Sequence, residues 1–193
     1  MKNNYAEIDF PKIQKEIHDH NVEWGFHGDN EPSEIEYRCL IIEEILEAYR
    51  AFDEGTSPVY FNVADGRIDA VNDPKEYLEF TIARNQILKP EGYAVELVDV
   101  AMRCLDYLEA KGGVYSNEWI SIYQLGSNYF RHLIEISCKD TMSGSIAHKW
   151  VDLVIDSILR FFDVQEWDFL SILELKMRYN TTRPYRHGMK GVE

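Results

Sequence analysis

Two short acidic motifs are the parts of this chain best suited to chemistry. Glu44 and Glu47 are three positions apart, and so are Glu96 and Asp99. Helical residues at this spacing share one face, so each pair can present two carboxylates to the same side. Two antiparallel helices would bring all four carboxylates into one cleft, where their mutual repulsion has to be offset by cations. Oxygen ligands favour Mg²⁺, Mn²⁺ or Ca²⁺ over zinc, so we predict a Mg²⁺ site that also accepts Mn²⁺.

The position of Glu44 on its helix supports this interpretation. At about 100° per residue, Glu44 falls inside the apolar arc, Glu47 at the edge of the arc and Glu43 on the polar side. The arc is formed by Leu40, Ile41, Ile45 and Ala48. A carboxylate in such an arc is strongly unfavourable unless it is paired or bound to a metal. The other motif is weaker by itself, because it belongs to a polar stripe typical of a solvated helix face: Glu96, Asp99, Arg103 and Asp106.

A third motif is basic and lies near the end of the sequence. Lys176, Asn180 and Arg183 follow one another at helical spacings of four and three, so they share a face. Residues 176–193 hold five Lys or Arg and one Glu, a net +4 that leaves −18 on the rest of the chain. Two cations and an amide on one face suit a polyphosphate. The alternative is a solvated basic helix end favoured by the helix dipole.

Helical periodicity dominates the elements that must position these residues. Pro11 suits the first turn of a helix, and Gly25 suits its end. Asp65 and Gly66 lie between two β-prone runs, which predicts one small hairpin within residues 58–71. The expected class is therefore an all-α bundle of about seven helices. We expect these helices near residues 11–24, 33–53, 74–88, 93–110, 116–138, 145–162 and 165–180.

Composition narrows the possible functions. A chain of 193 residues suits one domain, and a net charge of −14 disfavours binding to duplex nucleic acid or to an anionic membrane. The sequence shows no secretory signal and no apolar run long enough to span a membrane, which favours a cytoplasmic protein. Three cysteines among apolar neighbours are expected to be buried free thiols: Cys39, Cys104 and Cys138. The six histidines are not grouped at metal-ligand spacing.

These motifs together resemble the MazG-like all-α nucleoside triphosphate pyrophosphohydrolases, which include dimeric dUTPases and dCTPases. Order, helix placement and the basic motif all contribute to the resemblance. The matching segments are Glu43-Glu44-x-x-Glu47-Ala48, then Glu91-Gly92-x-x-x-Glu96-Leu97-x-Asp99-Val100, then Lys176-x-x-x-Asn180-x-x-Arg183-Pro184-x-x-His187-Gly188. Relative to compact members, this single domain of residues 1–193 would contain insertions at about residues 55–90 and 114–164.

The resemblance implies a reaction and a role for each motif. Members cleave nucleoside triphosphates between the α and β phosphates, giving a monophosphate and pyrophosphate, and many are homodimers. Mg²⁺ would be held by Glu44, Glu47, Glu96 and Asp99, and phosphates by Lys176, Asn180 and Arg183. Glu44 and Glu47 would be the catalytic residues, with Glu47 accepting the proton of a metal-bound water. Asn21 and Trp24 fall where members contact the base.

A second interpretation keeps the scaffold but removes the catalysis. A non-catalytic helical module that binds a nucleotide or a protein partner could present the same acidic stripe as a solvated or cation-binding face. Trp24 also has an alternative role, because it continues an apolar stripe with Ile13 and Ile17 that is more typical of a core. Binding of a nonhydrolysable nucleotide without turnover would favour this second interpretation.

Overall fold

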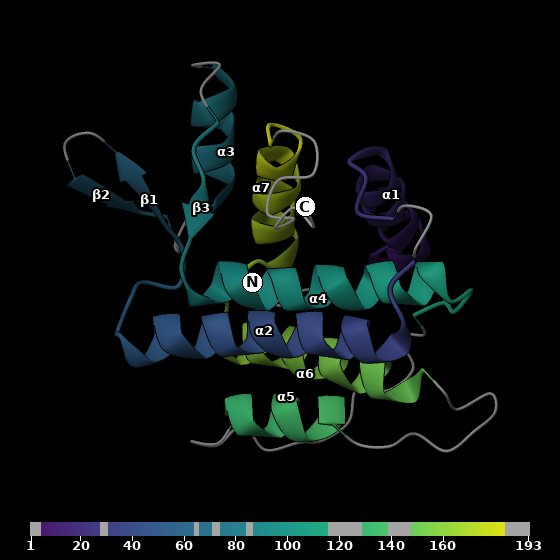
Figure 1. Ribbon diagram of the computed structural model, residues 1–193. Helices are drawn as coiled ribbons and strands as arrows, with labels where there is room; N and C mark the ends of the chain where they lie inside the picture. Colours follow the sequence, from purple (N-terminus) through teal and green to yellow (C-terminus); the bar gives the residue numbers. More distant parts are fainter. Residues whose placement is uncertain are drawn as a thin grey trace, which may run out of the picture.

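The structure is a computed structural model that describes residues 5–27, 31–63, 66–70, 74–83, 87–115, 129–138 and 148–183. In these ranges the chain forms seven helices, a 3-10 turn at Tyr5–Glu7 and three short strands (Figure 1). The helices are α1 Phe10–Glu23, α2 Glu34–Asp53, α3 Pro74–Ala83, α4 Tyr93–Ala110, α5 Tyr129–Cys138, α6 Lys149–Gln165 and α7 Phe169–Asn180. The strands are β1 Tyr60–Val63, β2 Gly66–Asp69 and β3 Pro90–Glu91. The predicted mostly helical fold is thus confirmed.

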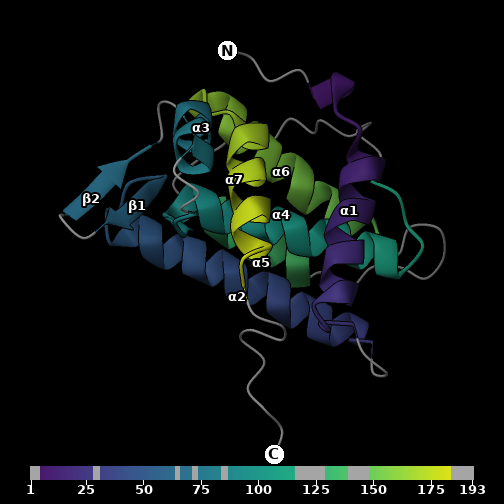
Figure 2. The ribbon, with the colours of Figure 1, turned by 90° about the horizontal axis from the view of Figure 1, so that it is seen from above.

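Helix α4 lies at the centre of the bundle. Helix α2 runs antiparallel beside it, α6 packs against it, and α5 packs against both α2 and α6 (Figure 1). Helices α1 and α7 cross α4, as the view from above shows, and α3 packs against α7 (Figure 2). The three motifs predicted to act together therefore lie on helices that pack on one another, because α2 and α7 both contact α4.

Local sequence signals set where the helices around the site begin. Ser33 and Glu36 form a capping box at the start of α2, in which each side chain accepts a hydrogen bond from the backbone N–H of the other. The carboxylates of Asp9 and Asp168 accept backbone hydrogen bonds at the starts of α1 and α7. These caps fix the first turn of each helix and thereby the face on which its later side chains point.

The polar stripe of α4 is not the solvated face that it resembles in isolation. Glu96, Asp99 and Arg103 are partly buried, and Asp106 is buried. The reason is that α4 is surrounded: α6 covers its apolar side, while α1, α2 and α7 cover the stripe. Charged side chains enclosed in this way need partners, which the neighbouring helices supply.

The predicted hairpin is confirmed, and a third strand extends it. Strands β2, β1 and β3 form an antiparallel sheet in that order, with Tyr60 opposite Asp69 on one side and Glu91 on the other. Strand β3 has only two residues, too few for an alternating pattern to reveal it from sequence. Its pairing with β1 leads the chain directly into Gly92 and the start of α4.

We expect Gly92→Ala to destabilise the protein, because this glycine has a positive φ of 114° and no room for a side chain. An added Cβ would lie 2.4 Å from the Ser57 carbonyl oxygen and 2.5 Å from that of Pro58. The backbone conformation alone costs a non-glycine residue about 1–3 kcal/mol, and the overlap adds to it. Chemical denaturation should show a larger loss than in Gly112→Ala, where φ is 68° but no atom lies within 4 Å. Equal losses would contradict this account.

Several predicted helix limits need correction. The helix expected over residues 74–88 is described as far as Ala83 and does not reach residue 88, because residues 87–89 are not helical, as expected so close to Pro90. Helix α6 continues to Gln165 and ends in a left-handed Glu166, so α7 begins only at Phe169, after its Asp168 cap. Predicted helical residues 116–128 and 145–147, and the basic segment 184–193 with Arg186, His187 and Lys190, lie outside the described residues.

The prediction of three buried thiols is correct only for Cys104. Cys39 and Cys138 are free and exposed, because each occupies the outer side of an amphipathic helix whose other positions face the core. Apolar neighbours in the sequence do not decide the direction of a side chain on a helix. In the ranges that the structure covers, no helix has the length and apolar character needed to cross a membrane.

Candidate functional site

Three of the four predicted carboxylates lie together between α2 and α4. Single oxygens of Glu44, Glu96 and Asp99 all lie within 4.8 Å of one another, and all three residues are partly buried. The predicted ligand Glu47 is exposed on α2, one turn beyond Glu44. Its charge nevertheless raises the pKa of both Glu44 and Glu96, so it borders the cluster. The antiparallel packing of two i, i+3 pairs produces this arrangement.

Two basic side chains already contact the cluster. Arg103 donates from Nε to Glu44 Oε1 over 3.2 Å, and the Lys176 ammonium forms an ion pair with Asp99. The Lys176 side chain is only 5% exposed, so α7 supplies a buried cation to carboxylates on α4. Lys176 thus neutralises the acidic group in this structure, whereas the sequence suggested a residue that faces a phosphate.

The electrostatics of the cluster reflect crowding with little solvent. Burial, and then the charge of Asp99, raise the pKa of Glu96 to about 7. The same two causes raise the pKa of Glu44. Burial would lower the pKa of Lys176, but the charges of Asp99 and Glu96 outweigh it and raise that pKa. Carboxylates that ionise reluctantly here would gain from a divalent cation, and their oxygen donors fit Mg²⁺ or Mn²⁺.

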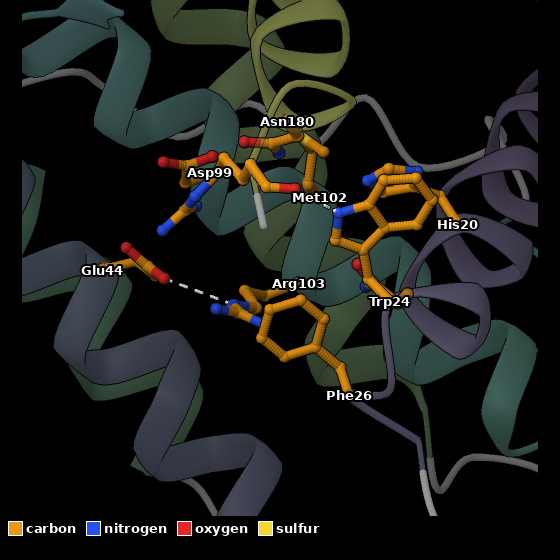
Figure 3. Close-up of a pocket in the computed structure, with 10 residues that line it drawn as sticks. His20, Trp24, Phe26, Glu44, Asp99, Met102, Arg103 and Asn180 are labelled. Carbon is orange, nitrogen blue, oxygen red and sulfur yellow. Dashed lines mark hydrogen bonds and ion pairs between the residues drawn. The ribbon is translucent and has the colours of Figure 1, made fainter. Parts of the chain in front are cut away.

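A pocket opens from the cluster toward α1 and the end of α7 (Figure 3). It brings together six residues that the sequence assigned to a site, from all three motifs and from the expected base-contacting segment: Asn21, Trp24, Glu44, Asp99, Asn180 and Arg183. The other predicted site residues, Glu47, Glu96 and Lys176, do not line it. The pocket therefore has an acidic side on α2 and α4 and an aromatic side on α1.

The aromatic side of the pocket is held in place by Trp24. The indole Nε1 donates to the backbone carbonyl of Arg183 over 2.7 Å, which ties the end of α1 to the end of α7. The His20 ring stacks on the indole at 4.4 Å between centroids. Trp24 is partly buried and lines a pocket. It therefore does not have the alternative role of a core residue, which its apolar stripe with Ile13 and Ile17 suggested.

The end of α7 carries two buried polar atoms that have no partner among the described residues. These are Asn180 Oδ1, an acceptor, and Arg183 Nε, a donor. Arg183 is partly buried, although its place near the end of the sequence suggested exposure. Unpaired buried polar groups are uncommon in folded proteins, and both residues line the pocket. Such atoms are suited to hydrogen bonds with a bound polar molecule.

Four lining residues were not assigned to a site from sequence: His20, Phe26, Met102 and Arg103. Arg103 was detectable, since it follows Asp99 by one turn in the polar stripe. The remaining three reach the pocket only because α1 crosses α4, a packing that local patterns do not encode. His20 adds an imidazole to the pocket that Glu44 and Asp99 line.

Comparison with protein-family models, curated proteins and solved structures finds no match to this chain.

We expect the metal-free protein to lose stability as the pH rises through the pKa of Glu96. The folded pKa of about 7 lies above the ordinary value of 4.5, so between these values the folded chain holds a proton that the unfolded chain has lost. Stability then falls as pH rises from about 4.5 to 7. Denaturation of wild type and Glu96→Gln in chelator at pH 5, 6, 7 and 8 tests this. The variant should show the smaller decline, and identical slopes would contradict the prediction.

Proposed function

We propose that the protein is a Mg²⁺-dependent nucleoside triphosphate pyrophosphohydrolase that converts a (d)NTP into a (d)NMP and pyrophosphate. The observation that carries this proposal is one pocket lined by carboxylates from both acidic motifs and by Asn180 and Arg183 from the basic motif. Hard oxygen ligands beside hydrogen-bond donors for phosphate are the usual requirements of nucleotide chemistry. The resemblance to MazG-like enzymes specifies the cleavage between the α and β phosphates.

The carboxylate cluster and the pocket beside it each have a role in this proposal. Mg²⁺, when bound by Glu44, Glu96 and Asp99 with Glu47 at the rim, supplies charge neutralisation and a lower pKa for a bound water. Arg183 donates charge-assisted hydrogen bonds to phosphate oxygens, and Asn180 donates to them from its side-chain Nδ2, since its Oδ1 can only accept. The exposed Glu47 accepts the proton of the attacking water, for which its contact with solvent is suitable.

The nucleoside would then lie on the aromatic side of the pocket. Trp24 and Phe26 offer ring faces to a base, and Asn21 offers an amide that can donate and accept hydrogen bonds. The hydrogen bond between Trp24 and the Arg183 carbonyl links the base-binding and phosphate-binding sides. This hydrogen bond would hold the base-binding side and the phosphate-binding side at a fixed distance from each other.

The experiment that tests the proposal is a product assay over a panel of NTPs and dNTPs with Mg²⁺, Mn²⁺, Zn²⁺ or excess EDTA. We expect equimolar monophosphate and pyrophosphate with Mg²⁺ or Mn²⁺, little activity with Zn²⁺ and none in EDTA. Release of orthophosphate would place the cleavage elsewhere in the triphosphate. Undiminished hydrolysis in excess chelator would overturn the metal assignment.

The second candidate function is a non-catalytic nucleotide-binding or partner-binding module. The observation in its favour is that Arg103 and Lys176 already neutralise part of the carboxylate cluster without a metal. Calorimetric titration with Mg²⁺ and a nonhydrolysable dNTP separates the two functions. Binding in this titration, combined with no product in the assay above, would establish the module.

The resemblance also implies a homodimer, and we propose that state for this chain. The net charge of −14 disfavours binding to duplex nucleic acid or to an anionic membrane. Light scattering coupled to size exclusion would give the oligomeric state directly. A mass of 22.6 kDa, that of one chain, would exclude the dimer.

A further inference from the structure

A second group of metal-ligating side chains lies farther along α4, outside the pocket. His18 on α1, His27 after α1 and Asp106 on α4 each offer one ligand atom, and these atoms lie within 4.8 Å of one another. Asp106 is seven residues beyond Asp99, which is about 10 Å along the helix axis. The three residues come together because α1 crosses the second half of α4 (Figure 2).

The carboxylate of Asp106 is the centre of this group. His18 Nδ1 lies 2.8 Å from Asp106 Oδ1, and His27 Nε2 lies 2.9 Å from Oδ1 and 3.0 Å from Oδ2. The Asp106 side chain is only 3% exposed. Among the described residues these two imidazoles are its polar partners in the structure, with no lysine or arginine paired to it. A buried carboxylate flanked by two imidazoles, with its charge not offset by a lysine or arginine, is a favourable environment for a divalent cation.

We propose that His18, His27 and Asp106 bind a transition-metal ion, with zinc as the physiological choice. Two imidazole nitrogens and one carboxylate oxygen are a usual three-ligand set for Zn²⁺, and imidazole selects zinc over Mg²⁺. Bonds of about 2.0–2.1 Å in a tetrahedron place ligand atoms about 3.3 Å apart. The present nitrogen–oxygen separations need to widen by only a few tenths of an ångström.

The surroundings provide the outer partner that zinc-bound histidine usually has. Tyr37 on α2 is buried, and its hydroxyl lies 3.3 Å from His27 Nδ1, the ring nitrogen that faces away from Asp106. When His27 Nε2 binds a metal, the ring proton moves to Nδ1 and donates to the Tyr37 oxygen. Such contacts fix the tautomer and orientation of the ring. The His18 side chain is 21% exposed, which leaves a route for the ion and a water as fourth ligand.

The ion would hold the wall of the pocket against the central helix. His18 precedes His20, Asn21 and Trp24 on the same helical segment, and His27 directly follows Phe26. A metal joining both histidines to Asp106 would fix both ends of this aromatic wall on α4. The chain would then contain two metal centres of different chemistry, an oxygen cluster for Mg²⁺ and a nitrogen-rich centre for zinc.

Metal binding by the full chain tests the proposal independently of any hydrolase activity. The exposed cysteines are first changed to serine in Cys39→Ser/Cys138→Ser, and excess Mg²⁺ is added to compete with zinc for the carboxylate cluster. Zinc is titrated by calorimetry, and Co²⁺ serves as the spectroscopic probe of a tetrahedral site. We expect one ion per chain and a Tm rise of about 5–10 °C at free zinc a hundredfold above Kd.

Three variants separate this centre from the carboxylate cluster. Asp106→Asn keeps the side-chain shape and should abolish the zinc-dependent Tm rise, while Asp99→Asn, two turns away, should retain it. Tyr37→Phe should weaken zinc affinity by about 10- to 100-fold, as expected for loss of an outer hydrogen bond. If Asp106→Asn does not fold, the partly exposed His18→Gln replaces it.

Two results would overturn the proposal. One is the absence of a zinc-dependent Tm rise in the parent protein. His18, His27 and Asp106 would then form only a hydrogen-bonded contact between the α1 segment and α4. The other is a rise that persists in Asp106→Asn or His18→Gln but disappears in Asp99→Asn, which would assign the zinc to the carboxylate cluster. A zinc centre in a chain without pyrophosphohydrolase activity would leave this inference standing, because its readout is binding.

Discussion

Glu44→Gln should eliminate turnover while leaving the fold intact. Glu44 lines the pocket and belongs to the carboxylate cluster, as Asp99 does, and it is the member that α2 contributes. Loss of one well-placed electrostatic group typically lowers kcat by about 10²–10³-fold, and loss of a metal ligand should be at least as severe. Product formation at saturating Mg²⁺ measures this effect.

The expected stability of Glu44→Gln follows from its surroundings. Burial and the charge of Asp99 both raise the pKa of Glu44, so a neutral amide relieves repulsion in the metal-free protein. Arg103 loses its ion-pair partner, but its side chain is 29% exposed and can be solvated. The metal-free Tm should therefore equal or exceed that of wild type. We expect added Mg²⁺ to raise the wild-type Tm and to have a smaller effect on the variant.

The neighbouring Glu43→Gln is the matched control. Glu43 is exposed on α2 and does not line the pocket, so its loss should change neither activity nor Tm appreciably. Wild-type activity in Glu44→Gln would remove this residue from the site. A collapse of Glu44→Gln both with and without metal would show instead that the carboxylate is structural, through its contact with Arg103.

Arg183→Ala should lower kcat/KM by roughly 10- to 150-fold. Hydrogen bonds to charged groups contribute about 1.5–3 kcal/mol each. If the variant loses that much transition-state binding energy, kcat/KM falls by the stated factor. Arg183 lines the pocket, and its Nε is buried without a partner among the described residues. Arg183→Lys should restore only part of the loss, because an ammonium keeps the charge but lacks the planar fork of donors.

Stability should change little in Arg183→Ala. The contact between Trp24 and residue 183 uses the backbone carbonyl, which alanine retains. The alternative role for Arg183, neutralising the end of α7, would contribute about 0.3–1 kcal/mol of stability without affecting kinetics. Measuring Tm and kcat/KM on the same variant separates the two roles, and an unchanged kcat/KM would remove the phosphate-binding role.

Arg178→Ala provides the comparison for a nearby basic residue outside the pocket. Arg178 is exposed on α7 and pairs with Glu174 one turn earlier, as surface side chains commonly do. Its removal changes the net charge as much as Arg183→Ala does, but should leave kcat/KM near the wild-type value. Similar losses in both variants would point to general electrostatic attraction of the nucleotide rather than a specific contact.

Features set by local backbone geometry could be predicted from the sequence. Glu44 was expected inside an apolar arc, and its side chain is only 17% exposed. The i, i+3 spacing of Glu96 and Asp99 placed them on one face, and the Asp65-Gly66 turn predicted the hairpin of β1 and β2. These features follow from backbone geometry over a few residues, so the residue types at neighbouring positions are sufficient to predict them.

Which helix faces meet depends on how the helices pack in three dimensions. The stripe from Glu96 to Asp106 resembles a solvated face in isolation, but Asp106 is buried and its other members are partly buried, because α1, α2 and α7 pack on this side of α4. The same crossings pair Lys176 with Asp99 and bring His18 and His27 to Asp106, nearly ninety positions away for His18. Contacts between residues so distant in sequence depend on how helices pack, and the local period of each helix contains no information about that choice.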